Sequence, residues 1–324
     1  MNNNKIRKGI NLVCAINDDF VLPFAVMLYS LLSNSGKKYE INFFIIDSGV
    51  SKENRGKFDY LSNDSSISLH WISVSESLYS TLPLWGRGRR QLYHSLLIPR
   101  LLPIDVEKVL YLDADLLILK NIESLWETRV DDCLLCAVQD MVIPVVSAPM
   151  GLHCYKEIGL SPLAPYFNSG VLLINLRGWR SENIADKVVG YLKKYHRRVA
   201  LFDQDGYNAI LSPNWKPLDL RWNVIASVSG RSFFNPKYIS REEYDNAIND
   251  PWIIHYAGYL KPWLANLGNR YDKIYKDYMT GQNRIGWKIP GDFKNRFLGF
   301  YDRNLRRFFY HLEHYLWTHK VNIK

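Results

Sequence analysis

Long apolar segments are missing from this sequence. No uncharged apolar run approaches the roughly 18–20 residues that a membrane-spanning helix requires. Residues 1–9 lead directly into a strand-like run, without the apolar core of a secretory signal peptide. Cysteine is also scarce, with four residues in a chain of 324, which is typical of proteins from a reducing compartment. These absences predict a cytosolic protein.

The common glycine-rich phosphate-binding patterns are absent as well. The sequence contains neither G-x-G-x-x-G nor G-x-x-x-x-G-K-[ST], so neither a dinucleotide fingerprint nor a P-loop holds phosphates. There is no internal repeat, low-complexity linker or nucleic-acid recognition module, and we expect no nucleic-acid partner. Hydrophobic residues make up 47% of the chain, which excludes a disordered protein and allows a substantial core.

Cys133 and Cys136 form a C-x-x-C pair. The pair lies inside the apolar run Cys-Leu-Leu-Cys-Ala-Val, and no second pair follows it. A single pair inside an apolar run is weak support for zinc or redox chemistry. We therefore interpret both cysteines as core residues.

The formal net charge of +9 is concentrated at the C-terminus. Residues 293–324 contain seven Lys or Arg residues, two acidic residues and nine aromatic residues. Phe293, Phe297 and Phe300 begin an approximate helical stripe with arginines beside it. Such a helix suits an anionic membrane surface. A C-terminal helix packed on the main domain, with solvated arginines, is the alternative; we favour the membrane interpretation.

Strand and helix patterns alternate through most of the chain. Strands are predicted at residues 10–16, 41–46, 67–74 and 109–119, and helices at residues 20–33, 52–61 and 92–102. This alternation indicates an α/β fold with a parallel sheet and right-handed crossovers. Beyond about residue 265 the pattern loosens. We therefore predict one domain over residues 1–265 and a basic, aromatic, helical appendage over residues 266–324 that contacts a membrane surface or positions the acceptor.

Asp113-Ala114-Asp115 interrupts an apolar run that is typical of a buried strand. Buried carboxylates are costly unless a metal or a hydrogen-bonded cation pairs with them. If the strand continues through the motif, both side chains point the same way. If the strand ends there, both lie at its carboxyl end, where open α/β sheets bind nucleotides. Two carboxylates with room for diphosphate oxygens suit Mg²⁺ or Mn²⁺ better than zinc, and a pair of surface acids is the alternative.

Four motifs follow one another along the chain. They are Val-Leu-Tyr-Leu-Asp-Ala-Asp at 109–115, Tyr-Phe-Asn-Ser-Gly-Val-Leu-Leu-Ile-Asn-Leu at 166–176 with Trp179, Asp-Gln-Asp at 203–205, and His-Tyr-Ala-Gly-Tyr-Leu-Lys-Pro-Trp at 255–263. In these motifs the chain resembles glycosyltransferase family eight, which includes bacterial lipopolysaccharide galactosyl- and glucosyltransferases and glycogenin. The resemblance covers residues 10–265. It implies a GT-A fold, a Rossmann-like mixed and mainly parallel sheet flanked by helices. It also implies transfer of a hexose from UDP-glucose or UDP-galactose with retention of anomeric configuration.

The resemblance implies a metal site as well. Asp113, Asp115 and His255 would bind a divalent ion. An imidazole beside two carboxylates shifts the preference from Mg²⁺ toward Mn²⁺, with Mg²⁺ as the alternative. Gly258 permits close backbone approach to the phosphates, and Lys261 would place a positive charge on them.

The remaining donor contacts come from the same matching of motifs. The residues implied for the nucleotide, besides the metal ligands, are Ala15, Asn17, Phe20 and Ala114, and those implied for the hexose are Asp140, Asn168, Asp203 and Gln204. Gln204 corresponds to the residue nearest the reacting face of the sugar in relatives. A carboxamide is a poor nucleophile, so we favour front-side displacement in which the departing phosphate oxygen assists the acceptor hydroxyl. A covalent intermediate on Asp203 or Asp205 is the alternative.

Three positions depart from the family pattern. Relatives commonly have Asp and Tyr where this chain has Asn17 and Phe20; Asn17 can still hydrogen-bond uracil, and Phe20 can stack on it. Relatives also commonly have Arg at the position of Ser95, so a cation near the donor is missing here. The arginines that could compensate are Arg89, Arg90 and Arg100.

The expected function is that of a retaining hexosyltransferase, peripheral on the inner face of the cell membrane. Its expected acceptor is a saccharide or lipid-linked saccharide, such as lipopolysaccharide core or another cell-surface glycan, which the basic C-terminal region would help it to reach. One alternative is a non-catalytic relative that keeps the fold for binding or scaffolding. Another is a basic membrane- or nucleic-acid-binding protein whose C-terminal region is its function. Four intact residues, Asp113, Asp115, His255 and Lys261, favour the enzyme.

Overall fold

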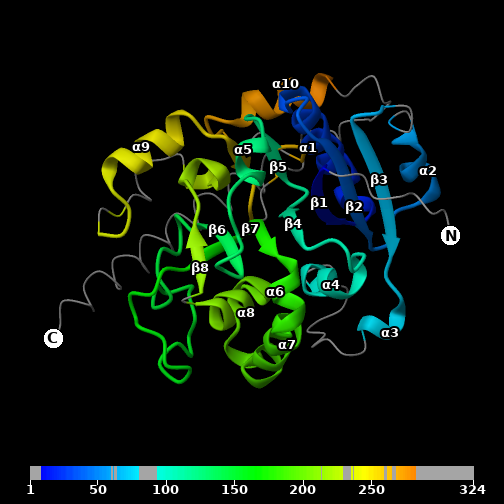
Figure 1. Ribbon diagram of the computed structural model, residues 1–324. Coiled ribbons are helices and arrows are strands. Elements are labelled where there is room, and N and C mark those ends of the chain that lie inside the picture. The colour runs from blue at the N-terminus through cyan, green and yellow to red at the C-terminus, as the bar shows by residue number, and fades with distance from the viewer. Residues whose placement is uncertain are drawn as a thin grey trace.

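A seven-stranded sheet forms the centre of the molecule (Figure 1). The computed structural model describes residues 9–59, 61, 64–79, 93–212, 214–228, 235, 237–258, 261–264 and 268–281. The strands lie in the order β3-β2-β1-β4-β7-β6-β8. Strand β7 runs antiparallel to both of its neighbours, and the other adjacent pairs are parallel. The strands of this sheet are β1 (Gly9–Ile16), β2 (Glu40–Asp47), β3 (Ile67–Ser73), β4 (Lys108–Leu112), β6 (Leu135–Gln139), β7 (Phe167–Asn175) and β8 (Trp215–Pro217).

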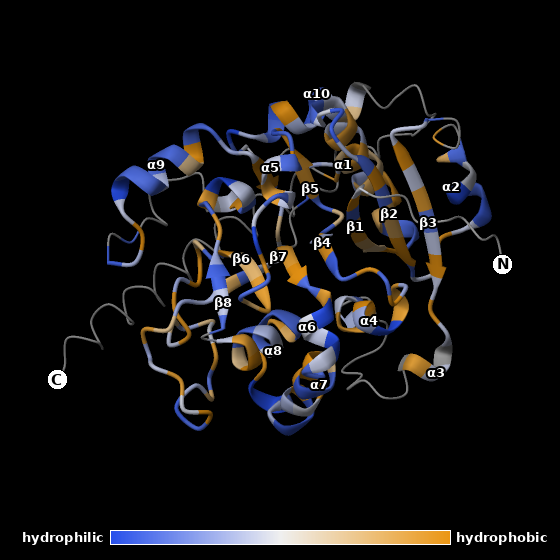
Figure 2. Ribbon diagram, viewed as in Figure 1, coloured by the Kyte–Doolittle hydropathy of each residue, from blue (hydrophilic) through white to orange (hydrophobic). Residues whose placement is uncertain are grey.

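Both faces of the sheet are covered by helices, which explains why its central strands are apolar at successive positions. Leu12 and Cys14 of β1 enter the core beneath α1, whereas Val13 enters the core on the opposite face. Figure 2 shows hydrophobic residues along the central strands and mainly hydrophilic residues on the outer helix α2. The first face is covered by α1 (Val21–Asn34) and α5 (Glu123–Trp126), and the second by α4 (His94–Leu101), α6 (Leu176–Ser181), α7 (Ile184–Lys194) and α8 (Phe202–Leu211).

The strand predicted over residues 109–119 is two strands in two different sheets. Strand β4 ends at Leu112, and β5 (Leu116–Ile118) pairs with β10 (Ile253–His255), which also pairs with β9 (Val224–Ile225). The single-strand prediction was wrong because the backbone changes partner within the Asp-Ala-Asp motif. The N–H of Asp113 donates to the carbonyl of Gly170 in β7, whereas the carbonyl of Asp115 accepts from Tyr256 beyond β10. The motif therefore lies at the carboxyl end of a strand.

The other predicted elements are present, with differences at their ends. The helix predicted over residues 52–61 is shorter, because α2 spans Lys52–Gly56 and gives way to turns. Helix α9 begins with a capping box, in which Ser240 and Glu243 satisfy each other's backbone N–H groups. The remaining helices are α3 (Glu76–Tyr79), α9 (Arg241–Asn249) and α10 (Asp272–Gly281), with short 3₁₀ helices η1 (Asp18–Phe20), η4 (His196–Arg198), η5 (Leu220–Asn223) and η6 (Ala226–Val228).

Helix α10 lies beside α1 (Figure 1) and packs on the body of the molecule, although it follows the boundary predicted near residue 265. Tyr271, Tyr275 and Met279 are buried in a cluster that includes Val26 of α1 and Leu117 of β5. The basic, aromatic segment at residues 293–324 lies outside the described residues. Its membrane-surface role and the division at residue 265 stay predictions.

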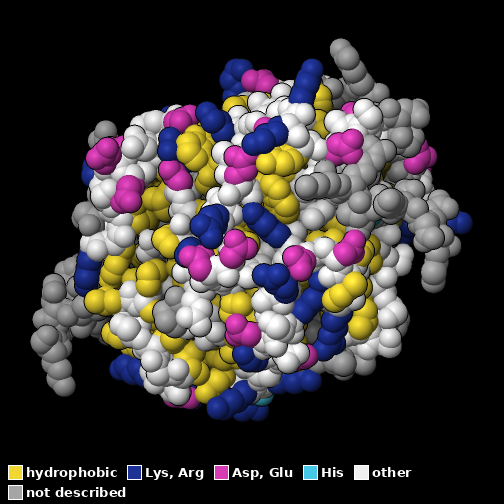
Figure 3. All heavy atoms as spheres, viewed as in Figure 1, with side chains coloured by type: hydrophobic (Ala, Val, Ile, Leu, Met, Phe, Trp, Pro, Cys, Tyr) yellow, Lys and Arg dark blue, Asp and Glu magenta, His cyan; other side chains and the backbone are white. Residues whose placement is uncertain are grey.

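The surface and the cysteines agree with a folded globular body. On the face seen in Figure 3, the basic and acidic side chains of the described residues are interspersed. Cys136 is buried in β6, and Cys133, which is half-buried, packs against the same core. Their sulfur atoms are 3.6 Å apart and do not form a disulfide.

Within the described part of the chain, no helix is both long and apolar enough to cross a membrane.

Candidate active site

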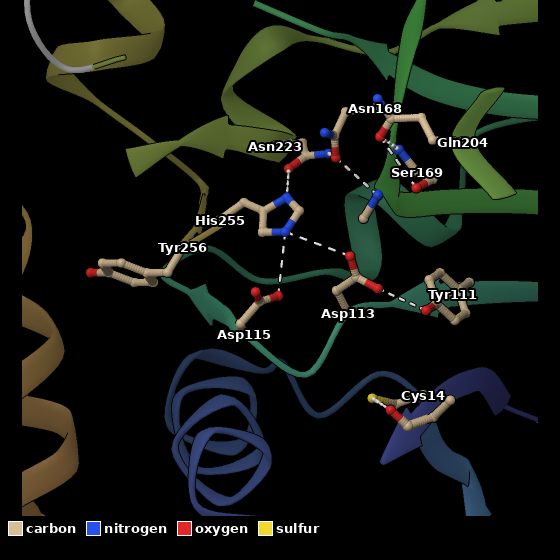
Figure 4. Close-up of polar contacts among 12 residues, drawn as sticks. Cys14, Tyr111, Asp113, Asp115, Asn168, Ser169, Gln204, Asn223, His255 and Tyr256 are labelled. Carbon is tan, nitrogen blue, oxygen red and sulfur yellow. Dashed lines mark hydrogen bonds and ion pairs between the residues drawn. The ribbon is translucent and has the colours of Figure 1, made fainter. Parts of the chain in front are cut away.

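Polar side chains from distant parts of the chain meet at one edge of the central sheet. This edge is formed by the carboxyl ends of β1, β4 and β6 and by the start of the antiparallel strand β7. The small sheet with β10 and the start of α8 complete the site (Figure 4). Open α/β sheets bind their ligands at this edge.

Asp113, Asp115 and His255 form a cluster that could hold a metal ion. One ligand atom from each residue lies within 4.8 Å of the others. His255 Nε2 is 3.5 Å from Asp113 Oδ2 and 3.3 Å from Asp115 Oδ1. The Tyr111 hydroxyl donates to the other oxygen of Asp113 at 2.7 Å. The side chain of Asp113 is 32% exposed and that of Asp115 is 10% exposed, so the cluster opens toward solvent on the Asp113 side.

The pKa of each group in this cluster depends on the charges of its neighbours. Burial opposes ionisation of Asp115, yet the ammonium of Lys261 and the imidazole of His255 hold the pKa of this carboxyl well below its usual range. Burial and the neighbouring Asp115 charge raise the pKa of Asp113. Burial opposes protonation of His255, but the two carboxylates raise its pKa overall. Lys261 also donates to the carbonyl of Tyr256 at 2.8 Å. Without a bound cation, one ammonium and one imidazole therefore balance the two carboxylates.

Asp140 is the centre of a second, neighbouring polar group. Its Oδ1 accepts from the backbone N–H groups of Val142 and Ile143, at 2.8 and 2.9 Å. Its Oδ2 accepts from the side-chain amides of Asn168, at 3.0 Å, and Gln204, at 3.3 Å. Burial raises the pKa of Asp140, and these four hydrogen bonds oppose that shift. The carboxyl therefore fixes two of the amides predicted to contact the hexose.

Gln204 is held at both ends of its carboxamide. Its oxygen accepts from the backbone N–H of Ser169 at 3.0 Å, and its nitrogen donates to Asp140. The side chain is buried at the start of α8. Its orientation is therefore set before any ligand binds.

Asp203 lies next to Gln204 but has different partners. Its Oδ2 accepts from the Ser95 hydroxyl at 2.8 Å, and its Oδ1 accepts from the backbone N–H of Gln204 at 3.0 Å. Burial, with a contribution from the charge of Asp113, raises the pKa of Asp203 to about 7. The preceding residue, Phe202, has a φ of +44°, which is strained for a bulky side chain. The backbone that aims Asp203 is thus held in an unfavourable conformation by its surroundings.

Asp205 has a structural environment. Its Oδ1 accepts from the Tyr166 hydroxyl at 2.6 Å, and its Oδ2 accepts from the backbone N–H groups of Ala200 and Leu201, at 2.7 and 3.1 Å. The side chain is almost completely buried. These contacts fasten the turn that leads into α8.

The loop after β1 contains an unsatisfied polar atom. Asn17 Oδ1 is buried and has no hydrogen-bond partner among the described residues. Phe20 packs edge-on against Trp263, with ring centroids 6.1 Å apart, and the Lys261 ammonium lies 6.0 Å from the Phe20 ring. Gly258, on the loop after β10, has a φ of +92°, which favours glycine. Lys261 therefore lies between the loop after β1 and the cluster of Asp113, Asp115 and His255.

The structure brings together most of the side chains singled out in the sequence. The metal cluster, Lys261, and the group of Asp140, Asn168 and Gln204 line one edge of the sheet, with Asp203 beside them. Ser95, at the position where relatives commonly have Arg, contacts Asp203 directly. Arg100 is paired with Asp186 on α7, so it does not replace that arginine. The other candidates for that role, Arg89 and Arg90, lie outside the described residues.

Two residues of the site were missed in the sequence. Asn223, at the end of η5, joins His255 to Asn168, and Gly170 lies against the imidazole of His255. Gly170 lies within one of the four motifs, but nothing in its spacing indicates contact with a histidine 85 positions later. Asn223 is in none of the motifs, so pattern alone could not have identified it.

A mixed, mainly parallel α/β sheet with an Asp-x-Asp motif at its carboxyl edge fits the GT-A fold of glycosyltransferases. The sequence matches the family described as "Glycosyl transferase family 8" over residues 11–267, and the chain belongs to this family. It is similar to General stress protein A of Bacillus subtilis, with 27% identity over 86% of this chain and 96% of the relative. It is also similar to a lipopolysaccharide 1,2-glucosyltransferase of Escherichia coli, with 26% identity over 79% and 74% of the two chains. The crystal structure of the galactosyltransferase LgtC with donor and acceptor sugar analogues has the same fold, with a TM-score of 0.70 and 24% identity over 84% of this chain and 96% of LgtC.

Proposed function

We propose that this protein transfers glucose or galactose from a UDP-sugar to a saccharide acceptor, in a metal-dependent reaction that retains the anomeric configuration. The observation that carries the proposal is the cluster of Asp113, Asp115 and His255 beside Lys261, at the edge of the sheet where nucleotides bind. Family membership supports sugar transfer as the reaction class.

The ligand set suits a divalent ion. Two carboxylates and one imidazole favour Mn²⁺, with Mg²⁺ as the alternative. When bound, the ion would neutralise the charge that develops on the departing diphosphate. Asp113, the more exposed carboxylate, faces the side from which a diphosphate can approach. In the structure, the ammonium of Lys261 neutralises Asp115. Once a cation shares that carboxylate, the ammonium would be free to contact a phosphate.

The loop after β1 supports a uracil site. The buried Asn17 Oδ1 lacks a partner among the described residues, and it matches the N3–H donor of uracil. Phe20 offers an aromatic surface next to it. The backbone at Ala15 and Ala114 lies at the ends of β1 and β4, where the ribose and diphosphate would pass.

The amides around Asp140 support a hexose site. Sugar hydroxyls need hydrogen-bond partners when they are desolvated, and Asn168, Gln204 and Asp140 are buried polar groups of fixed orientation. The carboxamide oxygen of Gln204 already accepts a backbone hydrogen bond, which weakens it further as a nucleophile. This favours front-side displacement, in which the departing phosphate oxygen takes the proton of the acceptor hydroxyl.

A covalent intermediate on a carboxylate is the competing mechanism. Asp205 is an unsuitable nucleophile, because its side chain is almost completely buried and its oxygens accept three hydrogen bonds from the protein. Asp203 is the remaining candidate, but burial raises its pKa to about 7, so about half of it is protonated at neutral pH. Mass spectrometry of the protein quenched during turnover should show no glycosyl-enzyme adduct. An adduct on Asp203 would contradict front-side displacement.

We extend the proposal to the acceptor and the place of action. The similarity to a lipopolysaccharide glucosyltransferase supports a membrane-linked saccharide such as lipopolysaccharide core or another surface glycan. The basic, aromatic residues 293–324 would bring the enzyme to the anionic inner leaflet. Sedimentation with anionic liposomes should be strong for the full chain and weak for a chain ending at residue 281. Equal binding of the two chains would eliminate membrane anchoring by this segment.

The metal and nucleotide parts of the proposal can be tested without an acceptor. Calorimetric titration with UDP should give tight binding in the presence of Mn²⁺ and much weaker binding without it. Asp113→Asn should remove the dependence on Mn²⁺, because one carboxylate ligand is lost. UDP binding that is equally tight with and without Mn²⁺ would contradict the assigned cluster.

A further inference from the structure

Asn223 is a buried residue whose side chain lies between His255 and Asn168 (Figure 4). Its Oδ1 is 3.0 Å from His255 Nδ1, and its Nδ2 is 2.9 Å from Asn168 Oδ1. We propose that Asn223 is a positioning residue. It fixes the tautomer and ring orientation of His255 for metal binding, and it couples the metal cluster to the amides of the hexose site. This inference rests on the proposed function of both sites.

The direction of these hydrogen bonds follows from one backbone group. The N–H of Gly170 contacts Asn168 Oδ1 at 2.9 Å, and a backbone N–H can only donate. The contacted atom of Asn168 is therefore its oxygen. Asn223 must present its amide nitrogen to that oxygen and its own oxygen to His255. The hydrogen on the neutral imidazole therefore lies on Nδ1.

This tautomer leaves the other ring nitrogen available to a metal. His255 Nε2 faces Asp113 and Asp115. Without a metal the ring carries a hydrogen on both nitrogens; a bound cation would displace the hydrogen on Nε2, while Asn223 keeps the one on Nδ1. A reversed Asn223 amide would turn its nitrogen toward Nδ1 and place the hydrogen on Nε2, where it would block a ligand bond. Hydrogen bonds to the second nitrogen of a metal-binding histidine commonly set its tautomer in this way.

Gly170 restrains the same imidazole from another side. A Cβ atom at this position would lie 2.3 Å from His255 Cε1 and 2.6 Å from Nδ1, so the ring packs directly against the strand backbone. The carbonyl of Gly170 also accepts from the N–H of Asp113 at 2.9 Å. One residue of β7 therefore positions the histidine and a carboxylate of the cluster together.

The chain of hydrogen bonds continues to the hexose side. The amide nitrogen of Asn168 donates to Asp140, which also accepts from Gln204. The backbone N–H of Ser169 donates to the Gln204 oxygen, so a second backbone group fixes this end. Loss of Asn223 would remove a hydrogen bond from both His255 and Asn168, and both sites would lose orientation.

The test compares Asn223→Leu, Asn223→Asp and a matched control, Asn42→Leu. Asn42 is equally buried, lies toward the amino end of β2 and donates to Asn11 Oδ1. Affinity for Mn²⁺ in the presence of UDP is measured from the electron paramagnetic resonance of the free ion. The His255 tautomer is read by ¹⁵N NMR of the complex with UDP and the diamagnetic ion Mg²⁺. Asn223→Leu should weaken Mn²⁺ binding about 10–100-fold and give a mixture of tautomers.

The variant Asn223→Asp separates the two contacts. Its carboxylate still accepts from Nδ1–H, so Mn²⁺ affinity and the tautomer should be kept, whereas the donor to Asn168 is lost. Its KM for the sugar donor should therefore rise while Mn²⁺ affinity changes little. Asn42→Leu should leave Mn²⁺ affinity unchanged.

Several outcomes would overturn the inference. These are wild-type Mn²⁺ affinity and a single Nδ1–H tautomer in folded Asn223→Leu, a loss of Mn²⁺ binding in folded Asn223→Asp, or an equal loss in Asn42→Leu. If Asn223→Leu does not fold, Asn223→Asp decides the question. Failure of the wild-type protein to bind Mn²⁺ with UDP would instead overturn the proposed function.

Discussion

At the scale of single residues, Asp203 has the most consequential environment for pH dependence. Its pKa is about 7 in the folded protein, because of burial and the nearby Asp113, against an ordinary value of 3.8. Between about pH 4 and pH 7 the folded protein therefore holds a proton that the unfolded chain releases. The free energy of unfolding falls as pH rises through this window, since the folded state binds more protons than the unfolded state.

Asp203→Asn should remove this pH dependence. An amide keeps the size of the protonated carboxyl but does not ionise, so the variant should gain stability relative to wild type as pH rises from about 5 to about 8. Urea unfolding at the two pH values measures the difference. A difference between Asp203→Asn and wild type that is the same at both pH values would contradict the raised pKa.

The sequence could predict a site residue where that residue lies in a recognisable motif, but not where it acts only through contacts made by the fold. Asp113, Asp115 and His255 occur in recognisable motifs because the chemistry requires those side chains. Asn223 and Gly170 act through partners distant in sequence, and only the packing of η5 against β7 and β10 brings those partners together. Ser95 could be recognised as a departure, but its hydrogen bond to Asp203 required the fold.

At the scale of secondary-structure elements, Arg180 of α6 fastens the connection between α4 and β4. Its guanidinium donates to five backbone carbonyls, those of Pro99, Leu102, Pro103, Ile104 and Val106. Carbonyls that follow a helix need partners, because the helix itself no longer supplies them. The planar fork of arginine can satisfy several at once, whereas a lysine ammonium cannot.

Arg180→Lys should therefore be destabilising by about 2–3 kcal/mol, comparable to the loss of a few hydrogen bonds to a charged group. The matched control is Arg177→Lys in the same helix, because Arg177 is exposed and pairs only loosely with Glu107, at 3.7 Å. The control should change the free energy of unfolding by less than about 0.5 kcal/mol. Denaturant unfolding measures both. Equal effects of the two substitutions would show that the carbonyl contacts contribute little.

The strands and helices of the first half of the chain were largely predictable, since their apolar periodicity reflects burial on both faces of the sheet. The run at residues 109–119 was the exception. Both β4 and β5 are buried and apolar, so hydrophobicity continues across a point where the backbone leaves one sheet for another. Periodicity records burial and carries no information about which strand is the partner.

At the scale of the whole molecule, helix α10 closes the core formed by α1 and the small sheet. Tyr275 is completely buried and packs edge-on against Tyr256, with ring centroids 4.9 Å apart. The hydroxyl of Tyr256 donates to the carbonyl of Tyr271 at 2.9 Å. Tyr256 directly follows His255, so α10 packs against the residue next to the candidate metal cluster.

A chain that ends at residue 268 should therefore be much less stable than one that ends at residue 281. Removal of Tyr271, Tyr275 and Met279 from the core costs roughly 4–9 kcal/mol, at about 1.5–3 kcal/mol for each buried side chain. Thermal unfolding followed by circular dichroism compares the two chains. Similar melting temperatures would show that α10 is an appendage rather than part of the folded body.

Basic residues are unevenly distributed along the sequence. Basic and acidic side chains are interspersed on the face of the body in Figure 3, whereas residues 293–324 are predominantly basic. Composition made this division predictable. The packing of α10 was missed, although the buried side chains of Tyr271, Tyr275 and Met279 recur at intervals of four residues, as on one face of a helix.

The proposed reaction is cleavage of a UDP-hexose at the cluster of Asp113, Asp115 and His255. The most direct test is release of UDP from UDP-glucose and from UDP-galactose, with and without Mn²⁺, by the wild type and by Asp115→Asn. Release should require Mn²⁺, be faster with one of the two sugars, and disappear in Asp115→Asn. Release that persists in Asp115→Asn, or that is independent of metal in the wild type, would contradict the proposed reaction.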